Sequence, residues 1–315
     1  MTELDEPLPT HKTRCFFLHV MKTGGYTLAT QLQRQFPAER IYGGYGSGES
    51  EFLTSTYLYL NPRPLAQLAG TTVAGFQMFA GHFPFAARSL MGDDVVTLTV
   101  FRDPVERVIS FLKHAQRNHN EHRDMPLEEI YEDPWYHARF FDNHEVKMFA
   151  MTPGQMLCHS SHDGWEDQGW DDDERALLRF WREDPAGLTP DERLRFHHLA
   201  VPVISEARGV YRLVGAPNTA EVAVDDDQVR RAIENLERVD VIGIFEDYDG
   251  FTRDVSSQLG LDVHSKMRRN VSEYQEVSKD LRTRIASQLG PSLEMYEAAR
   301  ALARARSTQP GRRIL

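Results

Sequence analysis

Residues 14–36 constrain the fold more than any other stretch of this chain, because they combine a buried strand, a glycine turn and a helix. The run RCFFLHV at 14–20 is short, apolar and aromatic, which is typical of a strand inside a sheet. Gly24 and Gly25 follow at once, and a helical pattern continues through Phe36. A strand, a glycine-containing turn and a helix in this order open many α/β folds that bind phosphate.

Strand and helix patterns alternate along the rest of the chain. Apolar runs predict further strands at 72–79, 95–101 and 239–245. Asp103 and Pro104 are typical of an N-cap and a first helical turn. Further helices are expected at 127–132, 135–150, 173–182, 189–198, 226–238, 247–259 and 277–306, the last broken at Gly290-Pro291. The alternation predicts an α/β protein with a parallel sheet flanked by helices.

The composition fits a soluble protein of a reducing compartment. Hydrophobic residues make up 41% of the 315 residues, which is enough for a buried core. No apolar run approaches the ~20 residues of a membrane-spanning helix, and residues 1–13 lack the apolar centre of a signal peptide. Two cysteines, Cys15 and Cys158, exclude a disulfide framework. We therefore expect a cytoplasmic protein with a single domain at 14–306 and mobile ends at 1–13 and 307–315.

The net charge of −11 comes from one segment. Residues 121–185 hold 17 acidic and 6 basic side chains, whereas the other 250 residues hold 30 of each. All four tryptophans (Trp135, Trp165, Trp170 and Trp181) also lie in this segment. The acidic balance argues against general nucleic-acid binding, which usually requires a basic surface. We interpret residues 121–185 as a helical insertion.

The glycine turn carries the first candidate site. Free backbone N–H groups around Gly24 and Gly25 suit a phosphate, Lys22 adds a cation, and Thr27 adds a hydroxyl in the first helical turn. The Walker pattern is absent because the lysine precedes the glycines. An ordinary strand-to-helix turn with an exposed lysine is the alternative interpretation.

The second candidate site begins where the strand at 95–101 ends. Arg102 offers a planar guanidinium at the sheet edge where α/β proteins bind ligands. Ser110 follows two turns into the helix, and only the fold can bring it to the same anion. Arg107 is expected to pair with Asp103 on the helix surface, as an i,i+4 ion pair. A capped amphipathic helix explains Asp103 and the valines but leaves Arg102 and Ser110 without a role.

Together these segments resemble the sulfotransferases that use 3′-phosphoadenosine 5′-phosphosulfate (PAPS), in particular the heparan and chondroitin branch with its bacterial relatives. That family has a P-K-T-[GA]-[GST] loop for the 5′-phosphosulfate and an R-D-P-x-x-R-x-x-S segment for the 3′-phosphate. The first motif is matched by Lys22, Thr23, Gly24, Gly25 and Thr27, and the second by Arg102, Asp103, Pro104, Arg107 and Ser110. Two departures are Met21 in place of proline and Tyr26 in place of a small residue.

The resemblance implies a P-loop-like fold and assigns roles to these residues. PAPS would be bound by the loop from Lys22 to Thr27, Tyr26 included, and by Arg102 and Ser110. The segment GHFPF at 81–85 is similar to the family's G-H-x-P segment, which makes His82 the catalytic base and Lys22 the group that stabilises the leaving phosphate. The segment KMRRNVS at 266–272 resembles the family's basic loop near the cofactor, which adds Arg268 and Arg269 to the binding residues.

Alternatives remain for several of these residues. His82 is also compatible with a half-buried histidine at a strand end that makes one backbone hydrogen bond. Glu49 or Glu51 is an alternative base. His159, His162 and Asp163 have no specific metal-binding spacing, and the scheme requires no metal.

The expected activity is transfer of a sulfuryl group from PAPS to a hydroxyl, leaving 3′,5′-ADP. A segment of charge −11 over the acceptor path would repel a polyanion, so a small or glycosylated, non-polyanionic acceptor is expected. Aromatic side chains of this segment would stack on that acceptor, namely Tyr131, Trp135, Tyr136, Trp165 and Trp170. Alternatively, the tryptophans form the core of a helical subdomain. Alternative functions are a nucleotide-dependent phosphotransferase and a PAPS-binding or partner-binding protein without catalysis.

Overall fold

The structure is a computed structural model that describes residues 14–37, 40–42, 75–118, 122–157, 219, 222–263 and 276–307. Within these ranges, five parallel strands form one sheet in the order β2-β3-β1-β4-β5. The strands are β1 (Arg14–Leu18), β2 (Ile41–Tyr42), β3 (Met78–Gly81), β4 (Val95–Phe101) and β5 (Val241–Ile244). The prediction of an α/β protein with a parallel sheet is therefore confirmed.

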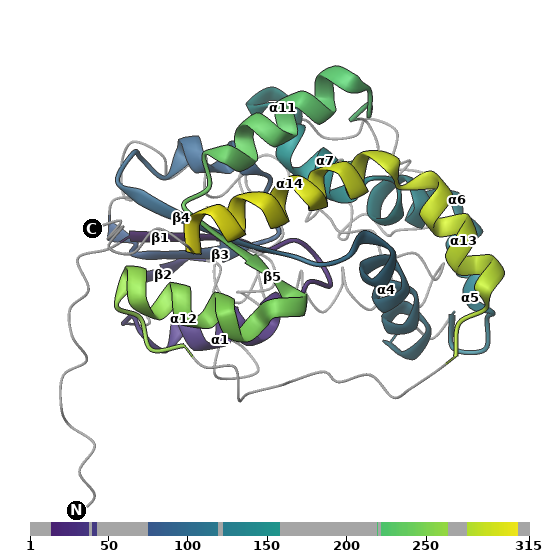
Figure 1. Cartoon of the computed structure of the whole chain (residues 1–315), viewed down its shortest axis with the longest axis horizontal. Coiled ribbons are helices and arrows are strands. Elements are labelled where there is room, and N and C mark those ends of the chain that lie inside the picture. The colour runs from purple at the N-terminus through teal and green to yellow at the C-terminus, as the bar shows by residue number, and fades with distance from the viewer. Residues whose placement is uncertain are drawn as a thin grey trace, which may run out of the picture.

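Helices cover both faces of the sheet (Figure 1). On one face, α1 (Gly25–Gln33) and α12 (Tyr248–Leu259) pack through Leu28 and Val255. On the other face, α7 (His144–Ala150), α11 (Asp226–Glu237) and α14 (Gly290–Ser307) pack through Phe149, Leu236 and Met295. Because both faces are covered, β1, β3 and β4 are almost entirely buried and read as continuous apolar runs.

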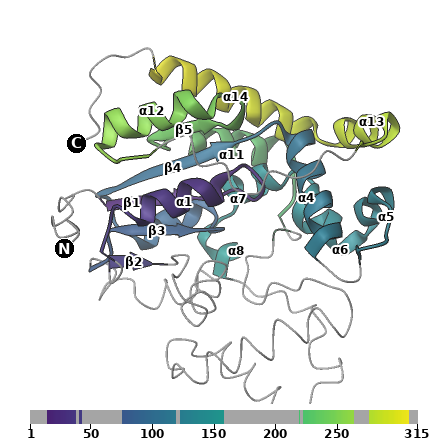
Figure 2. The same cartoon turned by 90° about the horizontal axis from the view of Figure 1, so that it is seen from below.

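A further group of helices lies at one end of the sheet (Figure 2). It contains α4 (Pro104–Asn118), α5 (Leu127–Glu132), α6 (Pro134–Tyr136), the π-helix η5 (His137–Phe141) and α13 (Lys279–Gln288). Short elements connect the rest, namely η3 (Phe85–Leu90), α8 (Pro153–Leu157) and η9 (Phe245–Asp247). In the described ranges no helix has the length and apolar character needed to cross a membrane.

The group around α4 has a separate aromatic core, and this corrects one expectation about the acceptor. Tyr131 and Tyr136 are buried there with Phe111, Phe140 and Phe141. The Tyr131 hydroxyl donates a hydrogen bond to Oε1 of Gln288. Neither tyrosine is available to stack on a bound acceptor, because both rings pack inside this core. The side chain of Trp135 and all of Trp165, Trp170 and Trp181 lie outside the described residues.

Most element boundaries follow the sequence patterns, with two exceptions. The strand expected at 72–79 has the wrong bounds, because β3 begins only at Met78 and continues to Gly81, residues 75–77 precede the strand, and 72–74 lie outside the described residues. The single helix expected at 135–150 is wrong, because the chain forms α6, η5 and α7 in succession. Asn143 interrupts it with a φ of 47°, a left-handed conformation that no helix interior accepts. The helices expected at 173–182 and 189–198 lie outside the described residues.

Candidate functional site

The sheet register brings four segments that are distant in the sequence to one edge. Leu18 at the end of β1 pairs with Gly81 of β3 and Thr99 of β4. Phe101 of β4 pairs with Ile244 of β5. In a parallel sheet the carboxyl ends of all strands share one edge, which is where α/β proteins bind ligands. The segments that leave this edge contain the loop at 22–27, His82, Arg102 and Phe245.

The loop at 22–27 has the backbone of a tight anion-binding turn. Lys22 and Gly24 have positive φ values of 67° and 81°, so the chain reverses direction just before α1 begins. Gly24 at the N-cap of α1 has no side chain to accept from the first N–H groups of the helix, and such groups are where anions bind at helix N-termini. The Thr23 hydroxyl instead donates to the Val20 carbonyl at 2.9 Å and is buried. Thr23 therefore stabilises the turn with its side chain and can meet an anion only with its backbone.

Phe245 contacts this loop from the end of β5. A Cβ atom at Gly24 would lie 2.6 Å from the Phe245 ring, so position 24 requires glycine for space as well as for its φ. The guanidinium carbon of Arg102 lies 4.7 Å from the centroid of the same ring. Among the described residues Phe245 is the exposed large hydrophobic side chain, at 37% of its surface. It presents an aromatic face between the loop and Arg102.

Arg102 bridges the two motif segments that the sequence separates by 80 positions. Its Nη1 lies 3.4 Å from the carbonyl oxygen of Lys22, at the limit of a hydrogen bond. The residue is half-buried, and burial lowers the pKa of its guanidinium, while Glu106, Glu246 and Asp103 oppose that shift. The Nε of Arg102 is a buried donor that no group in the described part of the chain accepts. An anion is the natural partner for such a donor.

Positive charge accumulates around Lys22. Burial, together with the charges of Arg117 and Arg102, lowers the pKa of Lys22 to about 8. Lys113 lies with Arg117 toward the end of α4. Burial also lowers the pKa of Lys113, and the charges of Arg282, Arg117 and Arg102 act in the same direction. Like charges placed together destabilise one another until an anion neutralises them. The site is therefore suited to a ligand with more than one negative group.

His82 follows β3 directly and is held by the end of β1. Its Nδ1 lies 2.5 Å from the carbonyl oxygen of His19. Since a carbonyl can only accept, Nδ1 carries the proton, and this assigns the lone pair of the neutral ring to Nε2. Burial lowers the pKa of His82 to about 4, and the charge of Lys22 acts in the same direction. His82 is thus a neutral imidazole at pH 7 with an acceptor nitrogen at Nε2. The backbone hydrogen bond is the one expected of a structural histidine, so the geometry accommodates both interpretations.

Arg107 corrects the expected surface pair with Asp103. Its side chain is fully buried and forms an ion pair with Glu145 of α7, while Nη2 donates to the carbonyl oxygen of Phe140 at 2.9 Å. Asp103 is occupied elsewhere, because its Oδ1 accepts from the amides of Val105 and Glu106 at 2.9 and 3.0 Å. The predicted N-cap is therefore confirmed, and the predicted ion pair is wrong.

The remaining predicted residues divide into those near this edge and those outside the described ranges. Ser110 is half-buried on α4, Tyr26 is half-buried in the first turn of α1, and Thr27 is buried beside it. Arg102 precedes α4 and Ser110 lies on it, but the structure shows no hydrogen bond between their side chains. The predicted residues Glu49, Glu51, His159, His162, Asp163, Arg268 and Arg269 lie outside the described residues.

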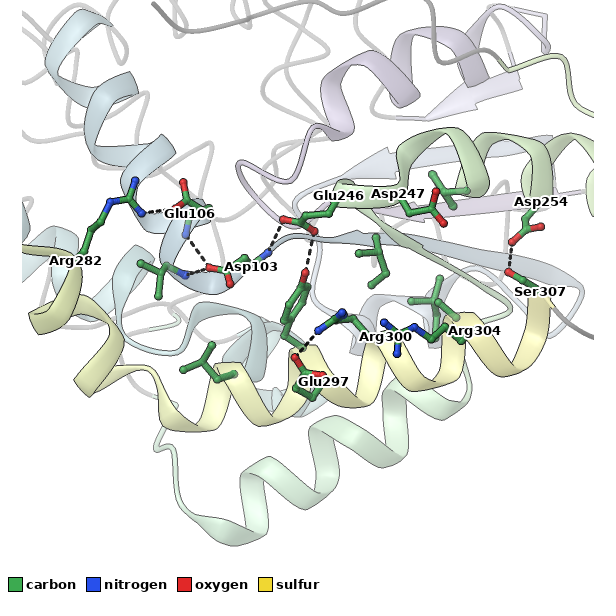
Figure 3. A pocket seen from close by; sticks show the side chains of 17 residues that line it. Asp103, Glu106, Glu246, Asp247, Asp254, Arg282, Glu297, Arg300, Arg304 and Ser307 are labelled. Atoms are coloured by element: carbon green, nitrogen blue, oxygen red, sulfur yellow. Dashed lines mark hydrogen bonds and ion pairs between the residues drawn. The ribbon is translucent and has the colours of Figure 1, made fainter. Parts of the chain in front are cut away.

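A separate pocket of about 900 Å³ is lined by Asp103, Glu246 and residues of α12 and α14 (Figure 3). Glu246 lines the pocket, and its carboxylate accepts hydrogen bonds from the Asp103 amide at 3.1 Å and from the Tyr296 hydroxyl at 2.9 Å. Three arginines (Arg282, Arg300 and Arg304) line it against six carboxylates: Asp103, Glu106, Glu246, Asp247, Asp254 and Glu297. The excess of negative charge makes this pocket unsuited to phosphate groups.

Several residues at the edge were missed by the sequence reasoning. His19 stands between β1 and the glycine turn, and the available signal was a titratable side chain near the end of the apolar run at 14–20. Lys113 and Arg117 follow Ser110 at i+3 and i+7, the spacing of one helix face. Phe245 ends an apolar run that was interpreted only as a strand.

No protein-family model matches this chain, and a search of curated proteins found no match either.

Proposed function

We propose that the protein is a sulfotransferase that uses PAPS as donor and a hydroxyl compound as acceptor. The observation that carries the proposal is the meeting of the Lys22 loop, His82 and Arg102 at one edge of a parallel sheet. These residues provide an uncapped helix N-terminus, clustered cations and a neutral imidazole. A donor with separate 3′-phosphate and 5′-phosphosulfate groups matches that distribution of charge, and its base would stack on Phe245.

The residues divide the chemistry among them. Sulfuryl transfer breaks the bond between sulfur and the bridging oxygen and forms a bond between that sulfur and the acceptor oxygen. The electron pair of the broken bond stays on the phosphate of 3′,5′-ADP, where Lys22 and the 23–27 amides stabilise the charge. The proton of the acceptor hydroxyl passes to Nε2 of His82. In this P-loop-like arrangement Arg102, Ser110 and the basic residues Arg268 and Arg269 would hold the 3′-phosphate side.

The acceptor in this proposal is small or glycosylated and not polyanionic, because residues 121–185 carry a net charge of −11. A screen with PAPS should find turnover among aryl alcohols, glycosides or glycolipids. Turnover with sulfated polysaccharides alone would contradict this part of the proposal.

Donor recognition is tested by isothermal titration of the full chain with 3′,5′-ADP and with ATP. We expect clearly tighter binding of 3′,5′-ADP, because its second phosphate on the ribose meets Arg102. Stronger binding of ATP would favour a phosphotransferase. Binding of 3′,5′-ADP with no transfer to any acceptor would favour a binding protein without catalysis.

Replacing Arg102 with alanine should weaken 3′,5′-ADP binding by about 10- to 150-fold, the equivalent of about 1.5–3 kcal/mol for hydrogen bonds to a charged group. The matched control is Arg230→Ala, since Arg230 is an exposed arginine on α11. Titration calorimetry of both variants measures the difference. Equal affinities in the two variants would remove Arg102 from the phosphate site.

The pH dependence of kcat/KM should have its plateau between the two shifted pKa values. His82 must be neutral to accept a proton, so activity is lost as pH falls through about 4 rather than through the usual 6.5. Lys22 must be charged to bind the donor, so kcat/KM also falls as pH rises through about 8. Lys22→Arg should move the alkaline limb upward, since arginine keeps its charge. An acid limb near 6.5 would contradict the assignment of His82.

A further inference from the structure

We propose that His19 is a positioning residue that fixes the ring of His82 against the donor loop. The expected effect of His19 on kcat rests on the proposed function, whereas its expected effect on the orientation of the His82 ring does not. His19 lies between the end of β1 and the loop, and no motif of the resemblance includes it.

The backbone of His19 holds the His82 segment from two sides. The His19 amide donates to the Gly81 carbonyl at 2.9 Å, which extends the pairing of β1 with β3 by one residue. The His19 carbonyl then faces Nδ1 of His82 at 2.5 Å. These two contacts set the height of the imidazole above the sheet edge and select its Nδ1-protonated tautomer.

The ring of His19 holds the ring of His82 in place. The two imidazole centroids are 4.5 Å apart with an interplanar angle of 37°. The His19 ring also stacks on Phe17 at 5.2 Å and 16°. Because Phe17 is fully buried in the sheet, it gives the His19 ring a rigid support. Rotation of the His82 ring toward β1 is blocked as long as the His19 ring is present.

The first turn of α1, which follows the donor loop, contacts the ring of His19. A Cβ atom at Gly25 would lie 2.2 Å from Cδ2 of His19 and 2.4 Å from its Nε2. The glycine therefore allows the first turn of α1 to rest directly on the imidazole. A chain of contacts runs from that turn, where an anion would bind, through His19 to His82.

His19 has no direct role in proton transfer in this arrangement. It is 6% exposed, and burial first, then the charges of His82 and Lys22, lowers its pKa well below the usual value. A permanently neutral ring under the loop can orient its neighbours without exchanging protons with them. The expected consequence is that His19 acts on His82 through the aromatic shape of its ring.

The test compares His19→Ala with His19→Phe in the full chain. We expect His19→Ala to lower kcat by about 10²-fold, the effect of a misplacement of about 1 Å, and His19→Phe to restore most of it. Nitrogen-15 NMR of the histidine rings should show His82 as one tautomer in the native chain and in His19→Phe. In His19→Ala it should show a mixture, because without the His19 ring the His82 ring is free to rotate away from the backbone carbonyl that selects the tautomer.

The control variant is Phe16→Leu, which disturbs a buried ring on the opposite face of β1. It should keep the single His82 tautomer. A single tautomer in His19→Ala, or a kcat loss in His19→Phe as large as in His19→Ala, would overturn the inference. The NMR measurement needs neither donor nor acceptor, so absence of all transfer by the native chain would reject the proposed function separately.

Discussion

Replacing His82 with alanine is expected to reduce sulfuryl transfer by about 10²- to 10⁴-fold, the usual contribution of a general base. The structural reason is the orientation of the ring. The His19 carbonyl holds the proton on Nδ1, so Nε2 is the basic atom. The affinity for 3′,5′-ADP should stay close to native, because the phosphates are assigned to the loop and to Arg102. Turnover with a responsive acceptor and titration with 3′,5′-ADP measure the two effects.

A matched control is His137→Ala, which removes a histidine of η5 that contacts Gln288 at 3.2 Å. It should leave transfer unchanged, apart from a modest loss of stability. If His82→Ala also keeps the native rate, His82 is a structural histidine, and Glu49 or Glu51 becomes the base to examine. If His82→Ala loses 3′,5′-ADP binding together with turnover, its role is in shaping the loop.

The strands β1, β4 and β5 were predictable because burial leaves a simple pattern of apolar residues in the sequence, whereas the two-residue strand β2 was not predicted. Val95–Phe101 is apolar throughout, apart from two threonines, because both faces of β4 are covered. The Asp103-Pro104 pair was equally informative, since an N-cap acts within three residues and needs no tertiary context. Local interactions of this kind are visible in one segment of sequence.

The failures concern contacts between distant segments. An arginine in an amphipathic helix is normally exposed, so Arg107 suggested a surface pair with Asp103. Its actual partner Glu145 comes from α7, 38 positions later, and the pairing exists only because the fold brings Glu145 within reach of the buried side of α4. The interruption at Asn143 has the same origin, since it supplies Oδ1 to the amide of Ser292 at the start of α14.

The candidate site was predictable in its motif residues and not in their neighbours. Lys22, His82 and Arg102 stand in recognisable segments, each at a strand end. His19 and Phe245 matter because β1 lies beside β3 and β4 lies beside β5, an order that the sequence does not state. The charges that act on Lys22 likewise depend on the fold, because Arg117 of α4 lowers the pKa of Lys22 although the two residues are far apart in the sequence.

The buried pair of Arg107 and Glu145 provides the largest expected effect on stability. Arg107→Met should lower the free energy of unfolding by about 3–5 kcal/mol, because it leaves the Glu145 carboxylate buried without its partner. Glu145 would retain only the hydrogen bond from the Ser292 hydroxyl, at 2.9 Å. The same change loosens α4, which carries Ser110 and follows Arg102, so 3′,5′-ADP binding should weaken as well.

Urea unfolding of three variants distinguishes the effect of breaking the buried ion pair from the effect of losing one positive charge. Glu106 lies on α4 like Arg107, but its partner Arg282 on α13 is exposed. Arg282→Met should therefore lower the free energy of unfolding by no more than about 1 kcal/mol. The double variant Arg107→Met with Glu145→Leu replaces both buried charges and should recover most of the stability, since no unpaired ion remains. A loss in Arg107→Met as small as in Arg282→Met would mean that water reaches Glu145.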